Sequence, residues 1–137
     1  MCMIDSNIWA YYLDADSPEH KFVVPEVKKA LREGVLINTV VAMEVAHFLV
    51  KNLGPVLGME KFDTFMGFPL AVDELDLELA RAAVGELCKY SHLGIGGRDA
   101  TLLASMRRKR VDRIMTHDEA LKRVPGLKAV DPIKSRS

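Results

Sequence analysis

Apolar and polar residues follow one another along the chain in blocks that predict strands and helices in turn. Short apolar runs typical of buried strands occur at residues 1–4, 35–39, 69–75, 113–116 and 127–130. Helical spacing of apolar residues predicts helices at 17–34, 40–54, 55–68, 76–89 and 98–110, with shorter helices beginning at about residues 6 and 118. Strands separated by helices imply βαβ units. We therefore expect a three-layer α/β fold with a central, mostly parallel sheet of about five strands and helices on both faces.

The clearest helical pattern covers residues 76–89. Its predicted buried stripe consists of Leu77, Ala80, Val84 and Leu87. Its predicted solvent-facing residues are Glu78, Arg81, Glu86 and Lys89. A second pattern predicts that the helix at 17–34 begins at Ser17, where serine caps the helix and Pro18 suits its first turn.

The composition is that of one globular domain. The 137 residues are 49% apolar and 28% charged, and neither a repeat nor a linker divides them. We expect a single domain over residues 1–137, with about 133–137 as a loose tail. No basic leader precedes the opening apolar residues, and no uninterrupted apolar run reaches the roughly 20 residues that span a bilayer. A cytoplasmic protein that does not bind membranes, with Cys2 and Cys88 as buried thiols, is the expectation.

The net charge of zero hides an uneven distribution. Residues 1–97 contain 14 acidic and 8 basic residues, whereas residues 98–137 contain 5 acidic and 11 basic ones. Such polarity can place acidic and basic surfaces around one site that binds cations and polyanions. The basic run RRKR at 107–110 also has a simpler explanation, because cations near a helix C-terminus complement the helix dipole.

Three aspartates stand where strands end or helices begin. Asp5 ends the first predicted strand, Asp118 follows the fourth, and Asp99 opens the helix after GIGG at 94–97. Ligand sites of open parallel sheets form at the carboxyl ends of strands, so these side chains are candidates for a shared site. Each one is also explained by helix capping, which is a favoured role of aspartate.

Glu44 has no such explanation. It lies about one turn into a predicted helix whose neighbouring residues are nearly all apolar. A buried ionised carboxylate needs a cation or gives up its charge. Glu44 therefore pairs with His47 or Lys51, faces water along a polar stripe with them, or faces a cleft shared with the three aspartates, where four acids would hold a divalent metal.

Four short motifs give the chain a resemblance to the PIN-domain nucleases. They are MIDSN at 3–7, VAMEVAH at 41–47, GGRDATLLA at 96–104 and IMTHDEAL at 114–121. The resemblance extends over essentially the whole chain in the order of elements and the spacing of acids, and it is most like the VapC toxins of toxin–antitoxin pairs. It implies a PIN-like form of the three-layer fold and a site whose catalytic and metal-binding residues are Asp5, Glu44, Asp99 and Asp118.

The same resemblance assigns supporting roles around these acids. The residues expected to orient ligands, water or a substrate phosphate are Ser6, Asn7 and Thr116. His117 departs from the family pattern, which usually has asparagine there, and Leu121 stands where an aromatic residue is common. The departure at His117 leaves the four acids intact but bears on the geometry around Asp118.

The implied chemistry is metal-dependent hydrolysis of RNA. Oxygen ligands favour Mg²⁺ or Mn²⁺, and we expect one or two ions per subunit. A metal lowers the pKa of a bound water and stabilises charge on the phosphodiester, and in this family the products have 5′-phosphate and 3′-hydroxyl ends. The candidates for binding RNA are Arg98, Arg107, Arg108, Lys109 and Arg110.

The resemblance also implies partners, namely a VapB-like antitoxin and a second copy of the chain in a homodimer. The apolar series Leu57, Phe62, Phe65, Met66 and Phe68 is then core, a dimer face or an antitoxin groove. Two alternatives stay open. One is a PIN-fold RNA-processing or non-catalytic RNA-binding module without an antitoxin; the other is an unrelated α/β phosphohydrolase or receiver-like domain that uses Asp5 without Glu44 and Asp99.

Overall fold

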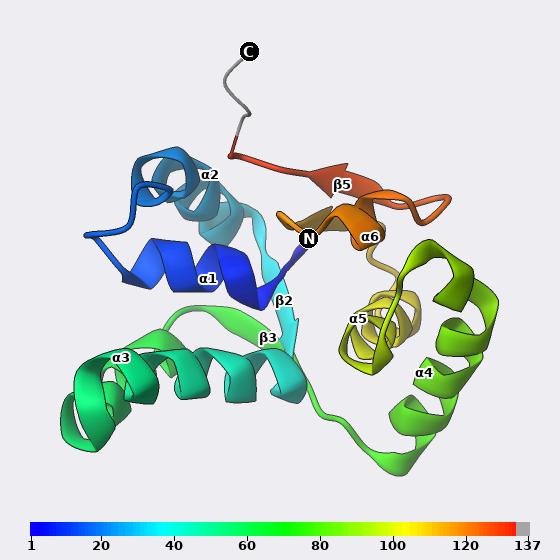
Figure 1. Cartoon of the computed structure of the whole chain (residues 1–137), viewed down its shortest axis with the longest axis horizontal. Coiled ribbons are helices and arrows are strands. Elements are labelled where there is room, and N and C mark those ends of the chain that lie inside the picture. Colours follow the sequence, from blue (N-terminus) through cyan, green and yellow to red (C-terminus); the bar gives the residue numbers. More distant parts are fainter. Residues whose placement is uncertain (134–137) are drawn as a thin grey trace.

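A five-stranded parallel sheet runs through the molecule between two groups of helices (Figure 1). The computed structural model describes residues 1–133, so most of the predicted tail, residues 134–137, lies outside the described residues. The strands are β1 (Cys2–Ile4), β2 (Val35–Asn38), β3 (Leu70–Asp73), β4 (Arg113–Met115) and β5 (Lys128–Val130). Their order is β3-β2-β1-β4-β5, and every neighbouring pair is parallel. The predicted α/β fold is confirmed.

The helices divide into two groups that cover the sheet. They are α1 (Ser6–Leu13), α2 (His20–Glu33), α3 (Thr39–Met66), α4 (Leu77–Tyr90), α5 (Gly97–Arg108) and α6 (Glu119–Lys122). Figure 1 shows α1, α2 and α3 together on one side and α4 with α5 on the other, in agreement with their contacts. Helix α2 begins at His20 rather than at Ser17, because Ser17 belongs to the preceding turn. There its hydroxyl donates to the carbonyl of Asp14.

Helix α3 is broken at the junction between the two helices that the sequence predicts. Gly54 has φ 83° and ψ 169°, a conformation that favours glycine, and Pro55 follows it. Beyond the kink the second part lies against the first, and a Cβ on Gly58 would come within 2.8 Å of the Cα of Val50. Within residues 1–133, α3 alone is long and apolar enough to cross a membrane by length and composition. The kink means that it is no straight span.

The packing of α4 corrects the predicted orientation of this helix. Leu77 and Val84 were expected to be buried but are 69% and 58% exposed. The side chains that face α5 are those of Leu79, Ala83, Glu86 and Tyr90. Both sets have helical spacing, and the set that is buried also has polar partners on α5, since Arg107 pairs with Glu86 and donates to the hydroxyl of Tyr90.

The aromatic residues form a cluster beneath α1. Trp9 is fully buried and packs edge-on against Phe65 with ring centroids 4.9 Å apart, while Phe68 packs on both rings. Phe65 and Phe68, which the sequence assigns either to the core or to an interface, therefore belong to the core. Leu57 and Met66 are 41% and 37% exposed. Of the two thiols predicted to be buried, Cys2 is buried, but Cys88 is exposed on α4 because it lies away from the face that packs on α5.

Candidate active site

Two of the four predicted acids follow neighbouring strands of the sheet. Asp5 follows β1 and Asp118 lies three residues beyond β4, and because these strands pair in parallel their carboxyl ends share one edge. The other two acids come from helices that begin near this edge: Glu44 from the second turn of α3 and Asp99 from the first turn of α5. Four separate elements thus bring one acid each to the same region.

The guanidinium of Arg98 lies among all four carboxylates. Its Nη1 contacts Oδ1 of Asp5 at 2.8 Å and Oε1 of Glu44 at 3.2 Å. Its Nη2 contacts Oδ1 of Asp99 at 2.7 Å and Oδ2 of Asp118 at 3.5 Å. One cationic group thus joins the acids, and Glu44 pairs with it rather than with His47 or Lys51, which are exposed.

The acids differ in how far they are removed from water. Asp5 is fully buried and the Asp99 side chain is 9% exposed, while those of Asp118 and Glu44 are 25% and 33% exposed. Burial opposes the charge of Arg98, but Asp5, Asp99 and Glu44 outweigh it and raise the pKa of this guanidinium above its usual range. Arg98 therefore stays charged at every physiological pH.

Asp99 is the acid whose ionisation the site disfavours most clearly. Burial raises its pKa to about 6; Arg98 opposes this shift, while the charges of Asp118 and Asp5 add to it. Its Oδ1 is buried and lacks a hydrogen bond, because the contact with Arg98 has the distance but not the geometry of one. Capping does not explain Asp99 either, since the N-cap of α5 is Gly96 and Asp99 lies within the helix.

Capping and clustering are compatible at Asp5 and Asp118. Asp5 is the N-cap of α1 and accepts a hydrogen bond from the backbone N–H of Ser6 at 2.7 Å. Asp118 is the N-cap of α6 and accepts one from the N–H of Ala120 at 2.8 Å. Each of these carboxylates has a second oxygen directed to another partner, so the two explanations that the sequence left open both apply.

Thr116 links the acids of β1 and β4. Its hydroxyl donates to Oδ2 of Asp5 at 2.8 Å and accepts from the backbone N–H of Asp118 at 3.0 Å. Of the other two residues expected to support the site, Ser6 donates its backbone N–H to Asp5, and Asn7 has a buried Oδ1 without a hydrogen-bond partner. The roles assigned to Ser6, Asn7 and Thr116 in orienting ligands stay predictions.

Asn38 connects two helices of the site and was not predicted from the sequence. It is fully buried at the end of β2, where its Oδ1 accepts from the N–H of Val41 and so caps α3. Its Nδ2 donates to the hydroxyls of Thr101 and Ser105 at 3.3 and 3.2 Å. One side chain thereby ties the helix of Glu44 to that of Asp99. A polar residue closing the apolar run VLIN, just before a helix, was the available signal.

Most of the other polar groups singled out from the sequence have local partners. Nδ1 of His117 lies 2.8 Å from Oδ2 of Asp131, which also pairs with Lys122 at 2.6 Å. At the far end of α5, Arg107 pairs with Glu86, and Arg108 pairs with Asp73 at 2.7 Å and with Asp76 at 3.0 Å. Lys109 lies 3.9 Å from Asp73. Arg110 is exposed and has a positive φ of 57°.

The donor set of the acidic site fits a hard divalent cation. All candidate ligands are carboxylate oxygens, a cationic group already lies among them, and one buried oxygen of Asp99 lacks a hydrogen bond. In the described chain, however, no three His, Cys, Asp or Glu side chains are already closed around a point that would hold a metal. The acids are arranged around the planar guanidinium of Arg98.

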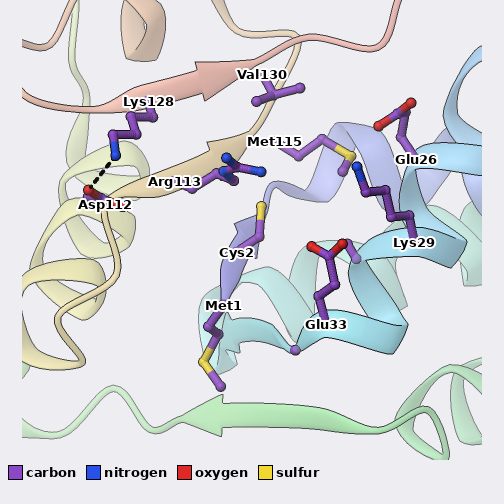
Figure 2. A pocket seen from close by; sticks show the side chains of 12 residues that line it. Met1, Cys2, Glu26, Lys29, Glu33, Asp112, Arg113, Met115, Lys128 and Val130 are labelled. Atoms are coloured by element: carbon purple, nitrogen blue, oxygen red, sulfur yellow. Dashed lines mark ion pairs between the residues drawn. The ribbon is translucent and has the colours of Figure 1, made fainter.

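A separate cavity of about 330 Å³ lies between α2 and β1, β4 and β5 (Figure 2). None of the four acids lines it, and its charges have both signs, including the pair between Lys128 and Asp112 at 3.4 Å. Cys2 points into it, and burial raises the pKa of this thiol to about 11, so it is not a nucleophile at neutral pH. The cavity therefore lacks the cluster of carboxylates that could bind a divalent cation.

Comparisons with known proteins agree with this architecture. A family model described as PIN domain matches residues 2–127. Ribonuclease VapC13 of Mycobacterium tuberculosis is 29% identical over 133 residues, covering 93% of this chain and 98% of that protein. The solved structure of VapC20 from Mycobacterium tuberculosis, described as a sarcin–ricin loop cleaving toxin, has a TM-score of 0.72 at 17% identity, over 93% of this chain and 98% of that one. A DNA-bound VapBC from Salmonella typhimurium has a TM-score of 0.75 at 16% identity, covering 96% and 98%. At such identities the two structures bear on the fold alone.

Proposed function

The chain belongs to the PIN-domain family, and from this membership we propose that it is a metal-dependent endoribonuclease that hydrolyses RNA phosphodiester bonds at the acidic site. The observation that carries the proposal is the convergence of Asp5, Glu44, Asp99 and Asp118 on one cationic group. A receiver-like domain that uses Asp5 alone has no need of the other three acids.

Asp5 and Asp99 are the first choices for direct metal ligands. They are the two most buried acids of the site, so their positions are fixed by packing. Glu44 and Asp118 are more exposed and would complete the site from its open side. When bound, one or two Mg²⁺ or Mn²⁺ ions per subunit would lower the pKa of a water ligand and stabilise charge on the phosphodiester.

The chain's own residues then position and protect the reacting groups. Thr116 donates to Oδ2 of Asp5, so Oδ1, which contacts Arg98, is the oxygen that would meet a bound cation. Asn38 fixes the helices of Glu44 and Asp99 relative to each other. Arg98 is the one basic candidate for RNA binding that contacts the acids, and Arg110, just beyond the other end of α5, is an exposed candidate with no ion pair among the described residues.

We further propose a toxin role in the cytoplasm, with a VapB-like antitoxin and homodimer formation. VapC13 is named a ribonuclease, and several similar structures are described as VapBC or toxin–antitoxin complexes. Apolar side chains exposed along α3 offer a surface for a partner. They are Met43, Val50, Leu53, Val56, Leu57, Met59 and Met66. The first three precede the kink and the last four follow it, so both parts of α3 contribute.

The test is cleavage of structured RNA with Mn²⁺ by the wild type, Asp5→Asn and Asp76→Asn. Asparagine at position 5 still caps α1 through its Oδ1, so the fold should survive. Asp76→Asn is the control, because Asp76 is likewise an N-cap, accepting from the N–H of Leu79 in α4, and contacts Arg108 rather than Arg98. We expect Asp5→Asn and chelation each to reduce cleavage by more than about a hundredfold, since outer-shell changes alone typically have ten- to hundredfold effects.

Cleavage by the wild type and by Asp76→Asn should leave 5′-phosphate ends. If the folded wild type binds RNA without cleaving it in Mg²⁺ or Mn²⁺, the chain is a non-catalytic RNA-binding module instead. Cleavage that persists in Asp5→Asn after chelation would place the activity outside the acidic site.

A further inference from the structure

The place where the four acids converge is already filled by a positive charge of the chain itself. Nη1 of Arg98 contacts the carboxylates of Asp5 and Glu44, and Nη2 contacts those of Asp99 and Asp118. We propose that Arg98 is a built-in counter-ion that takes the place of the divalent cation in the metal-free protein and must leave for the metal to bind. The inference rests on the proposed metal-dependent function and adds a competitor for its metal.

The electrostatic reason lies in the buried acids. Asp5 is fully buried and Asp99 nearly so, and without a cation their charges would repel each other in a poorly hydrated place. Arg98 supplies one positive charge through a planar fork, which suits several carboxylates at once. Removing it would leave the acids uncompensated, so the metal-free fold gains stability from this contact.

The geometry supports exchange between the guanidinium and a metal. Within the described residues the acids are spaced around a flat group and are not closed around a point. Metal binding therefore requires Arg98 to withdraw and the carboxylates to move inward. A metal entering this site exchanges one set of ionic contacts for another, which lowers its apparent affinity.

Arg98 is also placed so that it can withdraw. Its side chain is 32% exposed, whereas Asp5 and Asp99 are held inside. It is the second residue of α5, preceded by Gly96 and Gly97, and a Cβ on either glycine would meet no atom within 4 Å. The start of the helix is thus uncrowded, and the long side chain can move into solvent while the acids remain.

The proposal predicts two effects of opposite sign when the charge of Arg98 is removed. Without metal, Arg98→Met should melt at a lower temperature than the wild type, because the acids lose their cation. The same variant should bind Mn²⁺ more tightly, because the metal no longer competes. A purely structural role would weaken both properties, and a role only in RNA binding would change neither.

The experiment is titration calorimetry with Mn²⁺ alone, without RNA, at about pH 8, where Asp99 is ionised. The proteins are the wild type, Arg98→Met, Arg98→Lys and Arg81→Met, the last as a control that removes a positive charge from an exposed position on α4. We expect Arg98→Met to bind about tenfold more tightly than the wild type, on the scale of a few ion-pair contacts. Arg98→Lys should lie between them, and Arg81→Met should match the wild type.

The outcomes separate this inference from the proposed function. Equal or weaker Mn²⁺ binding by folded Arg98→Met overturns the counter-ion role and leaves the metal-dependent nuclease standing. Failure of both the wild type and Arg98→Met to bind Mn²⁺ overturns the metal site and the inference together. Melting curves with and without Mn²⁺ accompany each titration, and the metal should restore the stability that Arg98→Met loses.

A measurement on the wild type keeps the inference testable if Arg98→Met does not fold. The Nε–Hε signal of Arg98 can be followed by nitrogen-15 NMR during a titration with Mg²⁺, with Arg98→Lys identifying the signal by its absence. Withdrawal from the acids should move this signal toward the position of a solvated arginine. A signal that stays in place while Mg²⁺ binds would show that Arg98 and the metal do not compete.

Discussion

The hydroxyl of Thr116 donates to Oδ2 of Asp5 at 2.8 Å and joins two residues 111 positions apart in the chain. The hydroxyl oxygen of Thr116 also accepts a hydrogen bond from the backbone N–H of Asp118 at 3.0 Å. A single buried hydroxyl therefore fixes one acid at the end of β1 and another beyond β4, which are neighbouring strands. It contacts the carboxylate of Asp5 directly and holds Asp118 through its backbone.

Thr116→Val keeps the shape of the side chain but removes both hydrogen bonds. We expect the free energy of unfolding to fall by about 1–3 kcal/mol, because Oδ2 of Asp5 is left buried without its donor. Mn²⁺ affinity should fall about tenfold, as is typical when a partner of a metal ligand is lost. Calorimetry and denaturant melts measure the two effects. Thr116→Ser retains the hydroxyl and is the control; equal Mn²⁺ binding by both variants would contradict the orienting role.

Asn38→Ala tests whether the helices of the site are held in register. Asn38 caps α3 and donates to Thr101 and Ser105 of α5, so the substitution loses a cap and two hydrogen bonds in the core. We expect the free energy of unfolding to drop by about 2–4 kcal/mol, from the loss of a cap at about 1 kcal/mol and of buried hydrogen bonds at about 1 kcal/mol each.

Asn52→Ala is the matched control for this prediction. Asn52 lies on the same helix and donates to the carbonyl of Phe48, but its side chain is exposed. Its removal should change stability by less than about 0.5 kcal/mol. Folded Asn38→Ala should also bind Mn²⁺ more weakly, because Glu44 and Asp99 lose their common anchor. If only stability changes, Asn38 supports the fold without positioning the acids.

The fold was largely predictable from the sequence because its strands are short, apolar and separated by helical patterns. The orientation of α4 was not predictable in this way. Leu77 and Val84 share a face, as do Leu79 and Ala83, and both faces have helical spacing. The buried face is the one that meets α5, where Leu79 and Ala83 pack and Arg107 pairs with Glu86. A contact between two helices is not contained in the periodicity of either one.

The candidate site shows the same division. Glu44 stood out because no local rule accounts for a carboxylate in so apolar a helix. The position of Arg98 among the acids could not be derived, because its long side chain leaves the helix that also presents Asp99 and reaches acids from three other elements. Sequence distance says nothing about that reach, and the sequence indicates only an RNA-binding role for Arg98.

The raised pKa of Asp99 predicts how the stability of the metal-free protein depends on pH. The folded state holds this proton up to about pH 6, whereas the unfolded chain releases it near the ordinary aspartate pKa of 3.8. The folded state therefore binds more protons in this window, and the contribution to stability, complete below about pH 4, is lost as the pH rises through about 6. Two units of pKa correspond to at most about 3 kcal/mol.

Asp99→Asn removes this titration, so its stability relative to the wild type should rise between about pH 4 and pH 6. Denaturant melts across this range measure the difference. Asp76→Asn provides a contrast of opposite sign, because a hydrogen bond from Leu79 and then Arg108 lower the pKa of Asp76. The stability that Asp76 contributes is present at neutral pH and is lost on acidification. A constant difference between Asp99→Asn and the wild type would contradict the raised pKa.

In the basic run at the end of α5, Arg107, Arg108 and Lys109 lie near acidic side chains, whereas Arg110 has no ion pair among the described residues. Arg107 pairs with the buried Glu86, so Arg107→Met should lower the free energy of unfolding by about 1–3 kcal/mol by leaving that carboxylate without its cation. Arg110→Met should leave stability unchanged within about 0.5 kcal/mol and weaken RNA binding at low salt. Filter binding at two salt concentrations measures the RNA affinity of each variant. Equal RNA affinity in Arg110→Met and wild type would remove Arg110 from the RNA surface.

The proposed homodimer is tested at the exposed apolar side chains of α3. Val56 is 83% exposed beyond the kink, and burying such a residue against a second copy would contribute about 1.5 kcal/mol or more per side chain. Val56→Glu places a charge there and should convert a dimer into a monomer without lowering the melting temperature of the monomer. Val84→Glu is the control, because Val84 is 58% exposed on α4, on the other side of the sheet. Sedimentation equilibrium gives the mass of each protein. Dissociation by Val84→Glu but not by Val56→Glu would assign the dimer surface to α4 instead.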